Sequence, residues 1–247
     1  MRFYVSPECI FPDKNIIEIK DRSEIHHIRD VMRLDRGAAV DIFDGKSKEF
    51  SGCIEEVNKD SIIIKILDIK SVVGEGFKPS PTITLYQAIP KKNKMDFIIE
   101  KAVELGADVI VPIVTERTVP DIKDKAWKKK ERWSKIVMAS SKQCGRVKLP
   151  LVSDIVNFKE ALLKAKDSGL VIFAAIDKDA KPLKSLMKGV NPDSVSIFVG
   201  PEGDFSPKEI SMATGYGFEI ASLGKLILKS DTAGVYILAC LAYEYGF

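Results

Sequence analysis

The chain has 247 residues, of which 45% are hydrophobic and 30% charged, and its formal net charge is +3. This composition is typical of a globular protein that buries one large core or two smaller ones. No apolar run is long enough to span a bilayer and the first residues lack a secretory signal pattern, so we expect a cytoplasmic protein without a membrane partner. Four widely spaced cysteines and only two histidines argue against a metal site and against a disulfide scaffold.

Residues 1–72 carry mostly strand patterns. Residues 2–5 alternate as a strand does, and residues 38–44 read as a strand that runs into an Asp-Gly turn. Residues 49–69 read as two strands joined by a polar turn. A helix is expected at residues 21–34, where the apolar side chains fall on one face. Together these patterns predict a small barrel, and the glycines and prolines that follow predict a linker at residues 73–81.

Strands and helices alternate from residue 82 onward. The strands are expected at residues 82–89, 108–114, 170–176, 194–200 and 218–224. The helices are expected at residues 94–106, 124–145, 158–169, 206–217 and from Ser230 onward. This alternation predicts an α/β domain with a mostly parallel sheet that is covered by helices on both faces. In such sheets, ligands bind beyond the carboxyl ends of the strands.

Two of the strand ends carry unusual loops. The first is Gly200-Pro201-Glu202-Gly203, in which glycine lets the backbone approach a ligand closely and proline stiffens the chain. Ser206, Pro207 and Glu209 then predict a capped helix start. The second loop is the apolar run 223–228, whose main-chain groups could bind a purine edge while its side chains cover the ring. An ordinary strand–turn–helix connection would explain the first loop equally well.

The helix that begins at Ser230 has apolar residues on nearly every face. Such a helix is buried all round, either within the core or in a subunit interface. A core helix is the commoner of the two cases, and the sequence alone leaves both open.

Several segments of the chain together resemble one family. They are VGPEGDFSPKE at 199–209, LGKLILKSDTAG at 223–234, HHIRDVMRL at 26–34, and the longer stretches 91–118 and 128–146. The segments occur in order, at compatible spacing, through nearly the whole chain. They resemble the RsmE-type methyltransferases of the SPOUT class, which methylate N3 of a uridine in 16S ribosomal RNA of the small subunit.

This resemblance implies a PUA-like RNA-binding barrel at 1–72 and a SPOUT domain at 82–247, an α/β domain whose last segment is tucked into a trefoil knot. It also implies S-adenosylmethionine as the cofactor, small-subunit ribosomal RNA or the assembled small subunit as the partner, and a homodimer. The residues implied for cofactor binding are Ala175, Ile176, Gly200, Glu202, Gly203, Leu223, Gly224, Leu226, Ile227, Leu228, Thr232 and Ala233.

Two residues depart from the usual family pattern. Asp204 stands where a second glycine is common, and Lys229 stands where the family commonly has arginine. Lysine keeps the charge of arginine but loses its planar, two-pronged set of donors. The departure at residue 229 therefore leaves the role of that residue open, although not the family.

Methylation at uridine N3 requires that the imide proton leave, so a base or a group that stabilises the developing charge is needed. The catalytic candidates in matching segments are Glu104, Arg117, Gln143, Arg146 and Lys229. Simpler interpretations stay open, because Glu104 would also suit a solvated helix face and Arg117 would also suit an ion pair with Glu116.

Basic residues interleaved with aromatic ones are typical of surfaces that contact phosphates. The candidates for RNA binding are His27, Arg29, Arg33, Lys92 and Lys94. Solvated lysines are common, so each of these residues would also fit an ordinary wet surface. Two alternatives to the predicted reaction stay open: a non-catalytic RNA-binding or ribosome-assembly module, and a SPOUT methyltransferase with a different RNA target.

Overall fold

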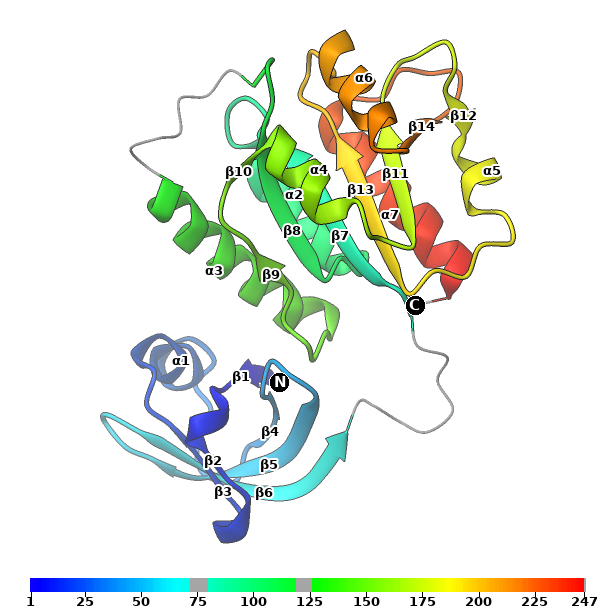
Figure 1. Cartoon of the computed structure of the whole chain (residues 1–247). Coiled ribbons are helices and arrows are strands. Elements are labelled where there is room, and N and C mark those ends of the chain that lie inside the picture. The colour runs from blue at the N-terminus through cyan, green and yellow to red at the C-terminus, as the bar shows by residue number, and fades with distance from the viewer. Residues whose placement is uncertain (72–79, 119–125, 247) are drawn as a thin grey trace. The chain divides into compact units, whose positions relative to one another are not determined.

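The computed structural model describes residues 1–71, 80–118 and 126–246 (Figure 1). The described residues divide into two compact units. The first consists of residues 1–71 together with Ser141–Leu149, and the second contains the remainder. Most of the predicted linker at 73–81 lies outside the described residues, and the domain boundaries at 72 and 82 stay predictions.

The first unit is built on a six-stranded sheet. Its strands follow one another across the sheet in the order β1 (Arg2–Tyr4), β4 (Ala39–Phe43), β5 (Lys48–Val57), β6 (Ile62–Ser71), β3 (Ile16–Ile19) and β2 (Ile10–Phe11). Only the pair β1 and β4 is parallel among these neighbours. Two short 3₁₀ turns, η1 (Pro7–Cys9) and η2 (Pro12–Lys14), flank β2. The strand patterns of the sequence predicted this barrel-like sheet correctly, although they missed β2 and β3.

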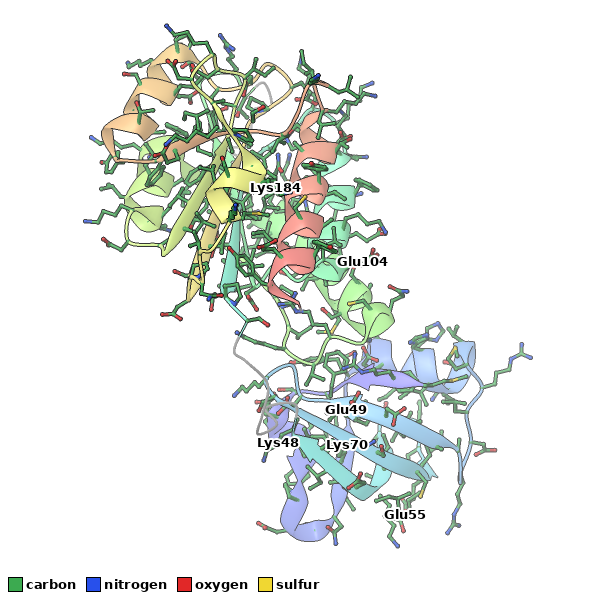
Figure 2. All side chains as sticks on the ribbon, turned by 90° about the vertical axis from the view of Figure 1, so that its right-hand side faces the viewer. Lys48, Glu49, Glu55, Lys70, Glu104 and Lys184 are labelled. Atoms are coloured by element: carbon green, nitrogen blue, oxygen red, sulfur yellow. The ribbon has the colours of Figure 1, made fainter. Side chains whose placement is uncertain are left out.

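The long hairpin of β5 and β6 bends because its register shifts twice, next to Ser51/Gly52 and between Ile54 and Glu56. A Cβ atom at Gly52 would lie 2.5 Å from the carbonyl oxygen of Lys65, so only glycine fits there. Such bulges increase the local twist and curl a sheet toward a barrel. Figure 2 shows Glu49 and Lys70, which oppose each other on these two strands.

The predicted helix at 21–34 is shorter and less regular than expected. It consists of α1 (Arg22–His26) and a π-helical turn, η3 (His27–Val31). The Asp21 carboxylate accepts a hydrogen bond from the Glu24 backbone N–H at 3.0 Å and so caps the start. The segment ends at Arg33, which has a left-handed backbone with φ 53°.

Residues 141–149 belong to the first unit although they are distant from it in sequence. The Arg2 guanidinium donates hydrogen bonds to the carbonyl oxygens of Ser141, at 3.0 Å, and of Arg146, at 3.1 Å. The Leu149 backbone N–H donates to the carbonyl oxygen of Gly45 at 3.0 Å. The sequence patterns did not predict this addition.

The second unit contains an eight-stranded, wholly parallel sheet. The strands lie in the order β10 (Val156–Asn157), β8 (Val109–Val114), β7 (Thr82–Ala88), β13 (Ser194–Val199), β11 (Leu170–Ala174), β14 (Glu219–Ser222) and β12 (Lys181–Pro182), with β9 (Leu151–Val152) beside β8. The predicted α/β class with a parallel sheet is confirmed.

Helices cover both faces of this sheet, as predicted. They are α2 (Lys94–Glu104), α3 (Ala126–Cys144), α4 (Phe158–Ala165), α5 (Leu183–Met187), α6 (Pro207–Gly215) and α7 (Ser230–Tyr245). In Figure 1, α4 and α6 lie in front of the sheet and α7 lies behind it. No helix of the described ranges is both long and apolar enough to cross a membrane.

The alternation of side chains along β7 explains the two layers. Ile83 and Leu85 point into the core that α2, α3, α5 and α7 share with the sheet, whereas Tyr86 and Ala88 point into the core under α4 and α6. In the second core, the rings of Tyr86 and Phe198 stack with their centroids 4.5 Å apart. A strand buried on both faces reads as a continuous apolar run, which is why the sequence identified it.

The last segment of the chain returns to the middle of the sheet. After β14, Ser230 at the start of α7 lies between Gln87 at the end of β7 and Gly200 at the end of β13. Helix α7 then packs on α2 and β13. This return agrees with the predicted tucking of the C-terminal segment, and its passage through a closed loop as a trefoil knot stays a prediction.

Candidate functional site

A cleft of about 420 Å³ lies in the second unit at the carboxyl ends of β11, β13 and β14, beside the start of α7. Its walls are formed by the loops that follow these three strands. Neighbouring parallel strands place their carboxyl ends at one edge of a sheet, so loops far apart in sequence meet there. This is the edge at which the sequence predicted a ligand.

The loop after β13 is held by a buried polar chain. The Ser230 hydroxyl donates a hydrogen bond to the carbonyl oxygen of Gly200 at 2.5 Å, and the Gln87 side-chain amide donates to the Ser230 hydroxyl at 3.0 Å. Gln87 is fully buried and Ser230 nearly so. Hydrogen bonds between buried polar groups fix geometry, so the bonds from Gln87 to Ser230 and from Ser230 to Gly200 determine where Gly200 lies.

Glu202 is anchored to the segment that precedes α2. Its carboxylate accepts a hydrogen bond from the Lys91 backbone N–H at 3.1 Å and lies 3.3 Å from the Lys94 ammonium. Burial alone would raise the pKa of the Glu202 carboxyl, but backbone hydrogen bonds from Glu202 itself and from Lys91, together with Lys94, outweigh burial and lower that pKa. The Lys94 ammonium also lies 3.8 Å from the Asp231 carboxylate. Glu202 is therefore an ionised anchor of the loop.

Arg117 anchors the end of the same loop. Its guanidinium donates to the carbonyl oxygen of Gly203 at 2.5 Å and, more weakly, to that of Phe205 at 3.4 Å. Next to it, the Glu116 carboxylate accepts a hydrogen bond from the Ser206 hydroxyl at 2.6 Å. The turn after β8 thus holds the segment that leads from the cleft into α6.

The predicted capping box at the start of α6 is confirmed. The Ser206 side chain accepts a hydrogen bond from the Glu209 backbone N–H, and the Glu209 carboxylate accepts one from the Ser206 backbone N–H. The other Glu209 oxygen accepts from the Glu116 backbone N–H at 2.9 Å. Both side chains are nearly fully buried. The helix start is a rigid support for the loop before it.

The loop after β14 forms another wall of the cleft and exposes apolar side chains and main-chain polar groups. Leu226 is 81% exposed and Ile227 80% exposed, and Ile176 across the cleft is 65% exposed. The main-chain groups of residues 225–228 make no hydrogen bond with another described residue. Exposed apolar side chains next to free main-chain donors and acceptors suit a flat heteroaromatic ring.

The cleft gathers most of the residues predicted to bind the cofactor. Those that line it are Ala175, Ile176, Gly200, Glu202, Leu223, Gly224, Leu226, Ile227, Leu228 and Ala233. Gly203 and Thr232 are not among the lining residues, although each lies next to one. The sequence analysis did not identify Asp204, Ser230 or the buried Gln87 as residues of the site. For Gln87 the only signal in the sequence was a single polar residue near the end of an apolar strand pattern. The binding roles of all these residues stay predictions.

The predicted catalytic residues do not all meet at the cleft. Lys229 lines it at the start of α7, and Arg117 holds its β13 loop. Glu104 lies near the end of α2 at the surface, where its carboxylate pairs with the Lys101 ammonium at 2.8 Å (Figure 2). Gln143 and Arg146 belong to the first unit. A catalytic role for each of the five stays a prediction.

The predicted RNA-binding residues also lie in two places. In the first unit, His27 is partly buried, with its ring edge-on to Phe3. Arg29 pairs with Asp30, whose pKa falls to about 2 through hydrogen bonds from Arg29 and His26. Arg33 is exposed. In the second unit, Lys92 is exposed and Lys94 pairs with Glu202, as described above. Their contacts with RNA stay predictions.

Comparisons with known proteins agree on one family. Residues 78–242 match the sequence family described as an RNA methyltransferase domain, and residues 19–67 match the one described as an RNA methyltransferase PUA domain. A ribosomal RNA small subunit methyltransferase E from Buchnera aphidicola is 32% identical over 91% of this chain and 89% of its own length. The chain belongs to the ribosomal RNA small subunit methyltransferase E family. The predicted family, the predicted enzyme class and the PUA-like character of the first unit are thereby confirmed.

Two solved structures of similar proteins hold the predicted cofactor. A methyltransferase from Legionella pneumophila in complex with S-adenosylmethionine is 30% identical, with a TM-score of 0.84 over 98% of this chain and 96% of its own. A methyltransferase E from Neisseria gonorrhoeae bound to S-adenosylmethionine is 28% identical, with a TM-score of 0.83 over the same shares. The cofactor prediction is confirmed for proteins of this fold and family.

The cleft of the present chain, a member of the methyltransferase E family, fits such a cofactor. The exposed Leu226 and Ile227 can cover an adenine ring, and the free main-chain groups beside them can bind its polar edge. Asp177 and Glu202 also line the cleft, so carboxylates are available to a positively charged sulfonium ligand. No group of three or more side chains among the described residues could hold a metal ion.

Proposed function

We propose that this protein is an S-adenosylmethionine-dependent methyltransferase that methylates N3 of a specific uridine in 16S ribosomal RNA. The observation that carries the proposal is the cleft at the ends of β11, β13 and β14, which gathers ten of the residues that the family resemblance implied for cofactor binding. Membership in the methyltransferase E family supports the same reaction. The names of the curated relatives support ribosomal RNA of the small subunit as the substrate.

In this proposal the loops hold and orient the reactants. Bound S-adenosylmethionine supplies an electrophilic methyl group on a sulfonium centre. The anchors on Gly200, Glu202 and Gly203 fix the cleft before the ligand enters, so little has to be ordered during the reaction. Rates depend strongly on such positioning, because transfer requires the nucleophile close to the methyl carbon and in line with the bond that breaks.

Lys229 is the predicted catalytic residue that lines the cleft. For a methyl group to replace the N3 proton of uridine, that proton has to pass to solvent water, and the uracil ring and its oxygens then carry negative charge. A cation fixed beside the ring stabilises that charge. We assign this role to the Lys229 ammonium, which sits at the start of α7 and is exposed toward solvent.

The uncovered side of α7 supports a homodimer. Ala233, Ile237, Leu238 and Leu241 pack into the core, but Tyr236 is 42% exposed and Tyr243 is 90% exposed. Exposed aromatic residues that repeat along one helix face are typical of interfaces. A cytoplasmic location follows from a ribosomal RNA substrate.

Nucleoside analysis tests the proposed reaction. Small-subunit ribosomal RNA from a strain that lacks the gene should have no N3-methyluridine, and the wild-type gene should restore it. Unchanged N3-methyluridine in the deletion strain would refute the proposal. A ribose-methylated or differently methylated product would instead support another RNA target. Purified protein that binds RNA but gives no heat with S-adenosylmethionine would support a non-catalytic module.

A further inference from the structure

Asp204 has an unusual backbone for a residue with a side chain. Its φ is 59°, in the left-handed region that favours glycine and that aspartate and asparagine tolerate better than most residues. It lies at the end of the loop after β13, where its own backbone N–H donates to the carbonyl oxygen of Pro201 at 2.9 Å. A glycine would relieve the backbone strain at this position, so the backbone conformation does not explain why an aspartate is here. The contacts of its carboxylate do.

Both oxygens of the Asp204 carboxylate are used. Oδ2 accepts a hydrogen bond from the Ile176 backbone N–H at 2.8 Å, and Oδ1 accepts one from the Phe205 backbone N–H at 2.8 Å. The carboxylate also lies against Gly200, since a Cβ atom built on that residue would be 3.1 Å from Oδ1. Hydrogen bonds to an ionised acceptor are about twice as strong as neutral ones.

The bond to Ile176 joins two walls of the cleft. Ala174 at the end of β11 pairs with Val199 at the end of β13, and the regular ladder between these two strands stops there. Beyond it, the hydrogen bond that joins the two loops, among the residues described, runs from Ile176 to Asp204. Asp204 and Ile176 both line the cleft, and the Ile176 side chain is largely exposed above it.

We infer that Asp204 is a positioning residue that fastens the loop after β11 to the loop after β13 and thereby sets the width of the cofactor cleft. The inference rests on the proposed function, since it takes the cleft to be the site of S-adenosylmethionine. Without the carboxylate, the loop that carries Ile176 has to be ordered when the ligand binds. Ordering at binding weakens affinity, whereas transfer from the bound state is unaffected.

The test compares three variants with the wild-type protein by calorimetry and steady-state kinetics. Asp204→Gly removes both bonds and suits the backbone, so we expect a Kd and a KM for S-adenosylmethionine about tenfold higher, with kcat within about twofold. Asp204→Asn keeps a carbonyl acceptor for the Ile176 N–H and should restore the Kd to within about threefold of the wild type. Asp179→Gly is the matched control. It removes a carboxylate from the loop that carries Ile176, and Asp179 itself does not line the cleft.

S-adenosylhomocysteine separates positioning from charge attraction, because it has the adenosine but no sulfonium charge. A clamp on the loops weakens both ligands equally, so Asp204→Gly should raise both Kd values by the same factor. The Ile176 amide should also exchange its hydrogen faster in the ligand-free variant, at an unchanged melting temperature within a few degrees.

Equal affinity of Asp204→Gly and the wild type for S-adenosylmethionine would overturn the inference. A loss confined to S-adenosylmethionine, with S-adenosylhomocysteine unaffected, would overturn it as well, because the carboxylate would then act on the sulfonium charge. Wild-type protein that binds neither ligand would instead count against the proposed function itself.

Discussion

Gly200 is a residue of the cleft at which any side chain would meet close neighbours. A Cβ atom there would lie 3.2 Å from the Phe205 backbone nitrogen and 3.1 Å from the Asp204 carboxylate. Because backbone cannot yield as a flexible side chain does, Gly200→Ala should displace the loop and raise the Kd for S-adenosylmethionine more than tenfold. Calorimetry measures this change.

Gly203 offers the matched control for that substitution. A Cβ atom there would lie 3.4 Å from Cδ of Arg117, a flexible side chain, and Gly203 does not line the cleft. Gly203→Ala should therefore change the Kd by less than about threefold. Equal losses in both variants would mean that the loop is sensitive to any substitution and that close packing at Gly200 is not the cause.

Lys229 is expected to act on the rate and not on cofactor affinity. If its ammonium stabilises charge on the uracil, Lys229→Ala should lower kcat about 10²-fold, as the loss of one such stabilising group does elsewhere. Lys229→Arg keeps the charge and should recover a large part of that rate. Single-turnover methylation of small-subunit RNA measures the effect, with Lys208→Ala on the exposed side of α6 as the control. An unchanged rate in Lys229→Ala would remove the residue from the mechanism.

Glu202 gives a pH dependence whose sign follows from its lowered pKa. The folded state holds the carboxylate ionised, so its contribution to stability is present above the ordinary pKa near 4.5 and is lost as the pH falls through the lower folded value. Glu202→Gln should therefore melt below the wild type at pH 7, and the gap should narrow below about pH 4.5. A gap that stays constant down to pH 3 would contradict an ionised anchor. Thermal unfolding followed by circular dichroism measures it.

The sequence predicted the loops of the site better than their supports. Glycine and proline at Gly200 and Pro201 are visible in a sequence because their backbone properties are their own. Ser230 and Gln87 act through a buried hydrogen-bonded chain that joins positions 143 residues apart. No local pattern encodes such a pairing, so only the fold could reveal it.

At the scale of elements, the capping box of α6 links the cleft to the rest of the sheet. Ser206→Ala removes the bond to the Glu209 backbone N–H and leaves the Glu116 carboxylate without the Ser206 hydroxyl. Loss of a cap of this kind costs about 1–2 kcal/mol of unfolding free energy. Urea denaturation measures it, and Thr214→Ala near the other end of α6 should cost less than about 0.5 kcal/mol. Equal losses of unfolding free energy in the two variants would show that the cap does not stabilise α6 more than an ordinary surface contact does.

The elements that the sequence missed share a physical cause. Strand β3 has only four residues and gains its place by pairing with β6, so its pattern is too short to separate from a loop. The helix at 21–34 has a helical pattern throughout, but a π-helical turn replaces its second half. Residues 141–149 join the first unit through contacts with Arg2 and Gly45, which periodicity cannot foresee.

At the scale of the whole molecule, the apolar character of α7 has two explanations, burial in the core and burial in a subunit interface, and they concern different sides of the helix. Ile237 and Leu241 are fully buried within the chain, which satisfies the expectation of a core helix on one side. On the other side, Tyr236, Ala239 and Tyr243 form an exposed stripe with a spacing of three to four residues. A single chain leaves this stripe in contact with water, and in the homodimer that we propose a second copy of the chain would cover it.

We therefore expect the wild-type protein to sediment at about twice 27.4 kDa at micromolar concentration. Tyr243→Glu places a charge within the proposed apolar interface, where its desolvation is costly, and should shift the protein to the monomer. Glu244→Lys, at an adjacent exposed position that already carries a charge, should leave the dimer in place. Analytical ultracentrifugation distinguishes these outcomes. A wild-type protein that sediments as a monomer would show that the exposed stripe of α7 is not a dimer interface.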